Sequence, residues 1–109
     1  QALATAARLE ARLEEGLTRR VLGRILAARG DAAGAWGSLE HSLAILREAG
    51  NPLELARTLA ALAALAPALG HHAAGRAALA EALPTLESLG ARRDLAEARA
   101  IAAGYEDAP

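Results

Sequence analysis

The sequence repeats itself at an interval of 40 residues, and this period limits the possible folds more than any other feature. A shift by one period superposes identical residues at several places: Leu13 and Leu53, Glu14 and Glu54, Thr18 and Thr58, Leu22 and Leu62, Gly30 and Gly70, Leu39 and Leu79, Leu43 and Leu83, and Gly50 and Gly90. The match continues into a third, half-length unit, in which Leu95-Ala96 repeats Leu55-Ala56. Because repeat proteins stack one such unit on the next, we expect an array of about two and a half units.

Each unit is predicted to contain two antiparallel helices. Apolar residues recur three or four positions apart, as at Leu13, Leu17, Val21 and Ile25, and this spacing is helical. Glycines stand 20 residues apart, where one helix must end and the next begin: Gly30, Gly50, Gly70 and Gly90. Residues 2–12 are also predicted to be helical, either joined to the first helix or as a helix of their own. The other expected helices cover residues 13–28, 32–48, 53–69, 72–89 and 93–103.

Local signals refine these boundaries. Asp31 and His71 stand where they can cap the helices that follow the mid-unit glycines. Pro67 is expected to end the third helix, and Pro84 to bend the fourth, because proline lacks a backbone donor. The polar tail, residues 105–109, is expected to fray. The single domain then divides into residues 1–12, the repeats 13–50 and 51–90, a terminal half repeat 91–104, and this tail.

Composition supports one all-α domain. The 109 residues suffice for a single core, and 53% of them are hydrophobic, mainly Ala and Leu, which favour helix. The formal net charge of −1 creates no field that would attract nucleic acid or an anionic membrane. Charged residues or His interrupt the Ala/Leu stretches, so no membrane-spanning run is expected. The lack of Cys excludes disulfides and thiolate metal sites.

Two features bear on the origin of the chain. All 12 basic residues are Arg, which is typical of a GC-rich bacterial genome. The sequence opens at Gln1 without a basic segment leading into an apolar one, so it shows no secretory leader. We therefore expect a cytoplasmic bacterial protein, and we interpret the sequence as a fragment of a longer one.

The recurring residues resemble the tetratricopeptide repeat family of helix hairpins. The first unit fits the family pattern at Leu22-Gly23, Leu26, Gly30, Ala35 and Leu39, and the second at Leu62-Ala63, Ala66, Gly70, Gly75, Leu79 and Ala82. The stretches GNPLELARTLAALA and GARRDLAEARA are similar to C-terminal repeats of large bacterial signalling proteins, where they follow an ATPase, nucleotide cyclase or transcription-factor module. The unit is longer than the usual length of about 34 residues. Arg19, Ala32 and Leu39 stand at the family's bulky aromatic positions, so the resemblance does not imply the standard peptide clamp.

The resemblance implies a right-handed array in which the first helix of each unit lines a concave groove. The groove positions that it implies are Leu17, Arg20, Arg24, Ala27, Ala28, Arg57, Ala60, Ala64, Pro67, Ala68, Glu97 and Ala100. Arg20, Arg24 and Arg57 would make this groove mildly basic and suited to carboxylates. The alternative interpretation is that these arginines are solvated or paired with acids: Glu14, Glu15 and Glu54.

Other sites are less well supported. The adjacent His71 and His72 do not have the spacing of metal ligands on a helix, and no nucleophile with a supporting acid accompanies His41. No metal, cofactor or catalytic site is therefore predicted. A glycine every 20 residues argues against a sustained coiled coil. Trp36 is interpreted as a core side chain, or alternatively as an interface anchor.

These observations favour a module for protein–protein interaction or assembly over an enzyme. An array of this length has two end faces without a polar cap, so exposed apolar surface is expected to meet a protein partner or a second copy. The alternative is a regulatory domain that senses a small ligand in the basic groove. An enzyme fragment ranks last.

Overall fold

The protein is all-helical over residues 2–106, the part of the chain that the computed structural model describes. Five α-helices follow one another, with one short 3-10 helix after the third: α1 (Ala2–Ala28), α2 (Ala32–Ala49), α3 (Pro52–Leu65), η1 (Ala66–Leu69), α4 (His72–Leu89) and α5 (Arg92–Glu106). The all-α prediction is confirmed, and the predicted boundaries agree with the observed ones within a few residues, except at the C-terminal end.

The first helix is a single element. Residues 2–12, which the sequence leaves open as a separate helix, continue without a break into the segment that follows. Gly16 and Gly23 lie on the side of α1 that faces α2, and a Cβ at Gly16 would meet Leu46 at 2.8 Å. These glycines therefore let the two helices approach closely, and the Ser42 hydroxyl donates a 2.7 Å hydrogen bond to the Gly16 carbonyl across the contact.

All four glycines at the 20-residue interval adopt the left-handed conformation that ends a helix, with φ values of 85° at Gly30, 73° at Gly50, 73° at Gly70 and 67° at Gly90. A side chain at any of them would be strained, which explains their recurrence. Asp31 caps α2 by accepting a 2.9 Å hydrogen bond from the Gly34 amide, as predicted. His71 occupies the equivalent position before α4 but makes no capping hydrogen bond, so its predicted capping role is wrong.

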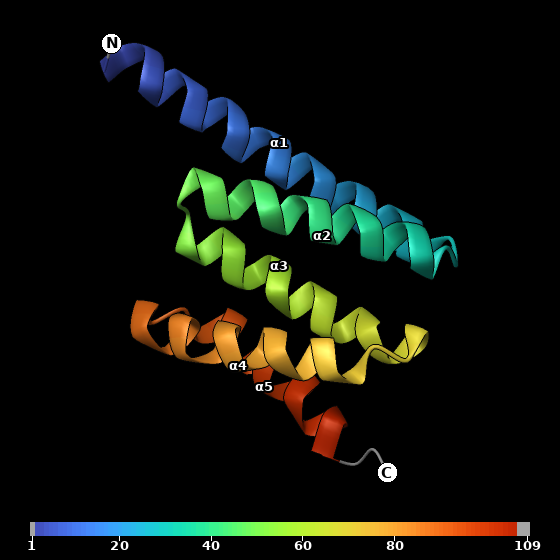
Figure 1. Ribbon diagram of the computed structural model, residues 1–109. Helices are drawn as coiled ribbons and strands as arrows, with labels where there is room; N and C mark the ends of the chain where they lie inside the picture. The colour runs from blue at the N-terminus through green and yellow to red at the C-terminus, as the bar shows by residue number, and fades with distance from the viewer. Residues whose placement is uncertain (1, 107–109) are drawn as a thin grey trace.

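The helices pack mainly against their neighbours along the chain (Figure 1). Helix α3 lies between α2 and α4, α1 packs on α2, and α5 crosses behind α4 and also contacts α3. The described part measures 53 × 32 × 20 Å, with the two ends of the chain at opposite ends of the molecule. Among the described helices, this order leaves one broad side of α1 and one of α5 without a helix against it.

The core is built largely from alanine and leucine. Its main cluster joins α3, α4 and α5 through these buried residues: Ala56, Leu59, Ala63, Ala78, Leu79, Ala82, Leu86, Ala98 and Tyr105. Small side chains at most of these positions allow the helices to pack closely along their length. Helix α4 continues through Pro84 without interruption.

The C-terminal end differs from its prediction. Residues 105 and 106 complete the last turn of α5 instead of fraying, and the Tyr105 side chain is buried. Helix α3 ends at Leu65, and Pro67 belongs to the 3-10 turn that follows. The remaining residues of the predicted tail, 107–109, lie outside the described part of the chain.

Within residues 2–106, one segment is long and apolar enough to cross a membrane: Pro52–Leu69, with a mean hydropathy of 1.3. No such segment was predicted from the sequence, because charged residues interrupt the Ala/Leu stretches. The segment is the central helix of the fold, and a third of it is buried between its neighbours. It also carries Glu54 and Arg57, which form an ion pair. A core helix passes the same test of length and composition, so the feature is weak evidence for a membrane span.

Candidate binding groove

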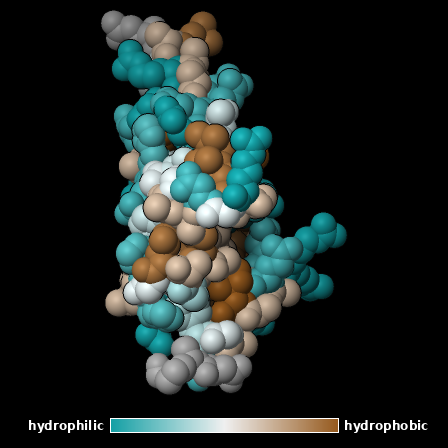
Figure 2. Space-filling model, turned by 90° about the vertical axis from the view of Figure 1, so that its right-hand side faces the viewer, coloured by the Kyte–Doolittle hydropathy of each residue, from teal (hydrophilic) through white to brown (hydrophobic). Residues whose placement is uncertain are grey.

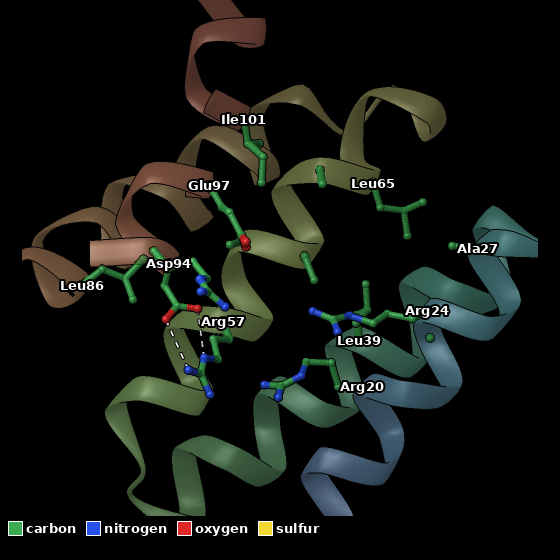
Figure 3. A pocket seen from close by; sticks show the side chains of 15 residues that line it. Arg20, Arg24, Ala27, Leu39, Arg57, Leu65, Leu86, Asp94, Glu97 and Ile101 are labelled. Carbon is green, nitrogen blue, oxygen red and sulfur yellow. Dashed lines mark hydrogen bonds and ion pairs between the residues drawn. The ribbon is translucent and has the colours of Figure 1, made fainter. Parts of the chain in front are cut away.

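Helices α1, α3 and α5 border a groove of about 560 Å³ (Figure 3). Side chains from α2 and α4 reach its floor between them. The lining residues are Arg20, Gly23, Arg24, Ala27, Leu39, Arg57, Ala60, Ala61, Ala64, Leu65, Leu86, Arg93, Asp94, Glu97 and Ile101. The groove is thus apolar at its base and charged along its walls.

The apolar base follows from the small residues of α3. Ala60, Ala61 and Ala64 present only methyl groups, so they leave space that larger side chains would fill. Leu39 from α2 closes the floor and is 3% exposed. It packs against Gly23 of α1, where a Cβ would lie 2.9 Å from it. The base can therefore accept apolar groups of a ligand at little cost in desolvation.

Arg20 is held in place by α3. Its guanidinium makes a 2.7 Å ion pair with Glu54 and also donates to the Glu54 carbonyl at 3.1 Å and to the Thr58 hydroxyl at 3.3 Å. The two charged side chains are only 12% and 18% exposed. Arg20 thus joins α1 to α3, and its donors are largely used within the fold.

Arg57 joins α3 to α5 in a similar way. It donates to both carboxylate oxygens of Asp94, at 3.0 and 3.3 Å, and to Glu54 at 3.1 Å. The hydrogen bond to Asp94, with the nearby charges of Asp94 and Glu54, raises the pKa of Arg57 above its ordinary value. Arg20 and Arg57, which were predicted as groove cations, are therefore paired with acids. This agrees with the alternative interpretation, in which the groove arginines pair with nearby acids such as Glu54.

Two arginines of the groove remain available for a ligand. Arg24 on α1 and Arg93 on α5 are exposed, and neither makes an ion pair or side-chain hydrogen bond with residues 2–106. Glu97 on α5 is also exposed and without such a partner in this part of the chain. Arg24 and Glu97 extend toward the middle of the groove from opposite walls (Figure 3).

The structure brings most of the predicted groove residues together. Those that line the groove are Arg20, Arg24, Ala27, Arg57, Ala60, Ala64 and Glu97. Leu17 is half-buried outside the lining, and four further positions implied by the resemblance also lie outside it: Ala28, Pro67, Ala68 and Ala100.

Two charged residues of the groove, Arg93 and Asp94, are not among the groove positions predicted from the sequence. Asp94 could have been found, because it follows Glu54 by one 40-residue period, as Glu54 follows Glu14. An acid therefore recurs at the same position of the 40-residue period, at residues 14, 54 and 94. Arg93 carries no such signal, because Leu13 and Leu53 stand at its equivalent positions.

Trp36 lies away from the groove, near the start of α2. Its ring is half-buried and packs against the ring of His71 with 4.8 Å between centroids and an angle of 58°. The contact joins the start of α2 to the turn before α4. Trp36 is therefore a partly exposed side chain close to the turns that precede α2 and α4.

Two other kinds of site are less well supported by the described residues. Across residues 2–106, no three side chains of His, Cys, Asp or Glu come together as metal ligands would. A second, shallow hollow lies beside Tyr105, lined by Arg76, Leu79, Ala102, Tyr105 and Glu106. Its only cation, Arg76, lies 5.6 Å from the Tyr105 ring. The groove between α1, α3 and α5 is thus the best candidate site.

Comparison of the chain with family models, curated proteins and solved structures finds no match.

Proposed function

We propose that this chain is a tetratricopeptide-like repeat module that binds an extended segment of a partner protein in its groove. Support for the repeat array comes from the four left-handed glycines at 20-residue intervals. Further support comes from two ion pairs between successive first helices, Arg20 with Glu54 and Arg57 with Asp94, whose acids stand one 40-residue period apart. In both, an arginine on one first helix holds an acid on the next.

One observation carries the binding proposal: an apolar floor lies beside two unpaired arginines on facing helices. Arg24 and Arg93 stand on α1 and α5, the two outer walls. A carboxylate held by an arginine forms charge-assisted, often paired hydrogen bonds. An apolar neighbour of that carboxylate could then lie against Ala64 and Leu65. The preferred ligand is therefore a peptide that combines acidic and apolar side chains.

A catalytic role receives no support from the groove. Among the groove-lining residues of the described part of the chain, Arg20, Arg57 and Asp94 are already committed to ion pairs, and the carboxylate of Glu97 has no Ser, Thr, Cys or His in the lining to act with. We therefore propose a binding role. The resemblance of GNPLELARTLAALA and GARRDLAEARA to repeats of bacterial signalling proteins supports a larger signalling or regulatory protein as its setting.

The alternative function is a sensor for a small anion. The groove volume of about 560 Å³ falls within the range of small-molecule sites, which supports this candidate. The two functions differ in the length of ligand required. A sensor would respond to a single small carboxylate, whereas a peptide site needs contacts along the groove.

The test begins with selection of random peptides displayed on phage against the 109-residue chain. A parallel selection uses the double variant Arg24→Glu/Arg93→Glu, and the matched control is Arg99→Glu, which changes an exposed arginine of α5 outside the groove. Sequences rich in Asp, Glu and apolar residues should be enriched by the original chain and the control, but not by the double variant. Equal enrichment by all three chains would contradict the proposal. Stabilisation of the chain by small carboxylates alone would favour the sensor.

A further inference from the structure

A stripe of exposed residues runs along the whole of α1 on the side away from α2. Its members are spaced alternately three and four positions apart: Ala4, Ala7, Ala11, Glu14, Thr18, Val21, Ile25 and Ala28. Val21 is 54% and Ile25 43% exposed, and Leu22 beside them is 38% exposed. This spacing is that of a seam between two packed helices. Figure 2 shows exposed apolar surface at the level of α1, separate from a second group at the level of α3 to α5.

The second unit shows what packs on this side of a first helix. One period after Thr18 and Leu22 stand Thr58 and Leu62, which are 0% and 4% exposed. There the preceding helix, α2, runs antiparallel to α3 and packs against it. The same side of α1 has no helix against it within the described residues. An antiparallel helix can therefore cover the edge of the stripe marked by Thr18 and Leu22, whereas the equivalents of Val21 and Ile25 in the second unit, Ala61 and Leu65, line the groove.

The stripe is complementary in size to an antiparallel copy of itself. Its positions are symmetric about residue 16, so a second α1 running in the opposite direction places Ala7 opposite Ile25 and Ala11 opposite Val21. Small residues then face large ones at each of these layers, which is how packed helices fill space. At the centre, Glu14 faces Thr18, whose hydroxyl can donate to the carboxylate. The contact would be about 40 Å long, from the rise of 1.5 Å per residue over α1.

The charges on α1 favour the same direction. Residues 2–15 carry two arginines and three glutamates, whereas residues 16–29 carry four arginines and no acid. Antiparallel packing places the slightly acidic half of one helix beside the basic half of the other. Arg20 is neutralised by Glu54, but parallel packing would still bring Arg19, Arg24 and Arg29 of each copy together, which is unfavourable.

We propose that two copies of this chain associate through antiparallel packing of their α1 helices along this stripe. The contact is isologous, so it closes as a dimer and leaves no free end for further growth. The groove residues Arg20, Arg24 and Ala27 are not members of the stripe. Self-association and peptide binding therefore use different surfaces and can be tested separately.

The first test is the solution mass of the 109-residue chain over a range of concentrations, by sedimentation. The mass should rise from 11.1 kDa toward twice that value. The variant Val21→Glu/Ile25→Glu should stay at 11.1 kDa at every concentration while keeping its helical circular dichroism. Leu89→Glu is the matched control, because Leu89 is 47% exposed but lies on α4, and it should dimerise normally. A monomeric original chain, or a stripe variant that still dimerises, would overturn the proposal.

The second test determines whether the two α1 helices run antiparallel or parallel. Because the chain has no native cysteine, any disulfide must form between the introduced cysteines. The double variant Ala11→Cys/Val21→Cys should form a covalent dimer under mild oxidation, because antiparallel packing places residue 11 of one copy beside residue 21 of the other. Ala11→Cys alone should remain uncross-linked. Efficient cross-linking of that single variant would indicate parallel helices and contradict the proposal. The stripe variant Val21→Glu/Ile25→Glu should still bind groove peptides, so failure of either proposal is distinguishable from failure of the other.

Discussion

The Tyr105 hydroxyl donates a hydrogen bond to the Ala63 carbonyl. In a regular α-helix this carbonyl would accept from the amide of the residue four positions later, but that residue is Pro67, which has no N–H. A side chain from α5 thus serves an acceptor that the sequence of α3 leaves without its usual donor. The contact requires Gly75 on α4, because a Cβ there would overlap the Tyr105 hydroxyl. Three helices are therefore joined at one side chain.

Replacement of Tyr105 by Phe is expected to lower the free energy of unfolding by about 1–2 kcal/mol, because a buried carbonyl loses its partner. The ring and its packing are retained, so the loss reports the hydrogen bond. Urea unfolding followed by circular dichroism measures the change. A variant as stable as the original chain would show that the bond contributes nothing.

The same side chain predicts a loss of stability at alkaline pH. Burial raises the pKa of Tyr105 above its ordinary value of 10.0, and the nearby charge of Arg76 opposes this only in part. Because the folded-state pKa exceeds that of the unfolded chain, the neutral phenol contributes stability that is fully present below pH 10 and is lost as the pH rises through the folded-state pKa. Ultraviolet absorbance during a pH titration measures the ionisation of Tyr105 directly, because the chain has one tyrosine. An ordinary titration in the folded protein would contradict the account.

The close contact of α1 and α2 depends on the absence of a side chain at Gly16. The substitution Gly16→Val should destabilise the fold by about 1–3 kcal/mol, because its side chain would overlap the buried Leu46. Gly37→Ala is the matched control. No atom lies within 4 Å of a Cβ at this exposed helical position, so the control should gain roughly 0.5–1 kcal/mol from helix propensity. Thermal and urea unfolding of both variants would reveal whether their effects have opposite signs.

Two ion pairs of different exposure should contribute differently to stability. Arg20→Gln removes a pair whose side chains are 12% and 18% exposed and is expected to cost about 1.5–3 kcal/mol. Arg47→Gln removes the Arg47–Glu81 pair, whose side chains are 48% and 40% exposed, and should cost less than about 1 kcal/mol. Comparable losses in urea unfolding would mean that burial does not decide the contribution of these pairs.

Much of the helical framework follows from local sequence. Gly30, Gly50, Gly70 and Gly90 mark every turn, because no other residue tolerates their backbone conformation so well. Asp31 caps α2 through a hydrogen bond only three residues away. Such features depend on neighbours in sequence, so composition and spacing suffice to predict them.

The parts that the sequence did not predict depend on contacts between distant residues. Tyr105 was expected in a fraying tail, and its burial arises only when α5 meets Gly75 and Ala63. Of the three arginines predicted for the groove, Asp94 and Glu54 engage Arg57 and Arg20, and Arg24 has no partner among residues 2–106. Periodicity indicates which residues share a helix face. It does not indicate which charges on that face already have partners.

The most direct test of the proposed function is a calorimetric titration of the most strongly selected phage peptide into the 109-residue chain. The account predicts saturable binding of one peptide per chain to the original protein and to Arg99→Glu. Binding to Arg24→Glu/Arg93→Glu should be at least about tenfold weaker, as expected when a charge-assisted hydrogen bond is lost. Equal affinity of all three chains would show that the peptide binds elsewhere and would contradict the assignment of the groove.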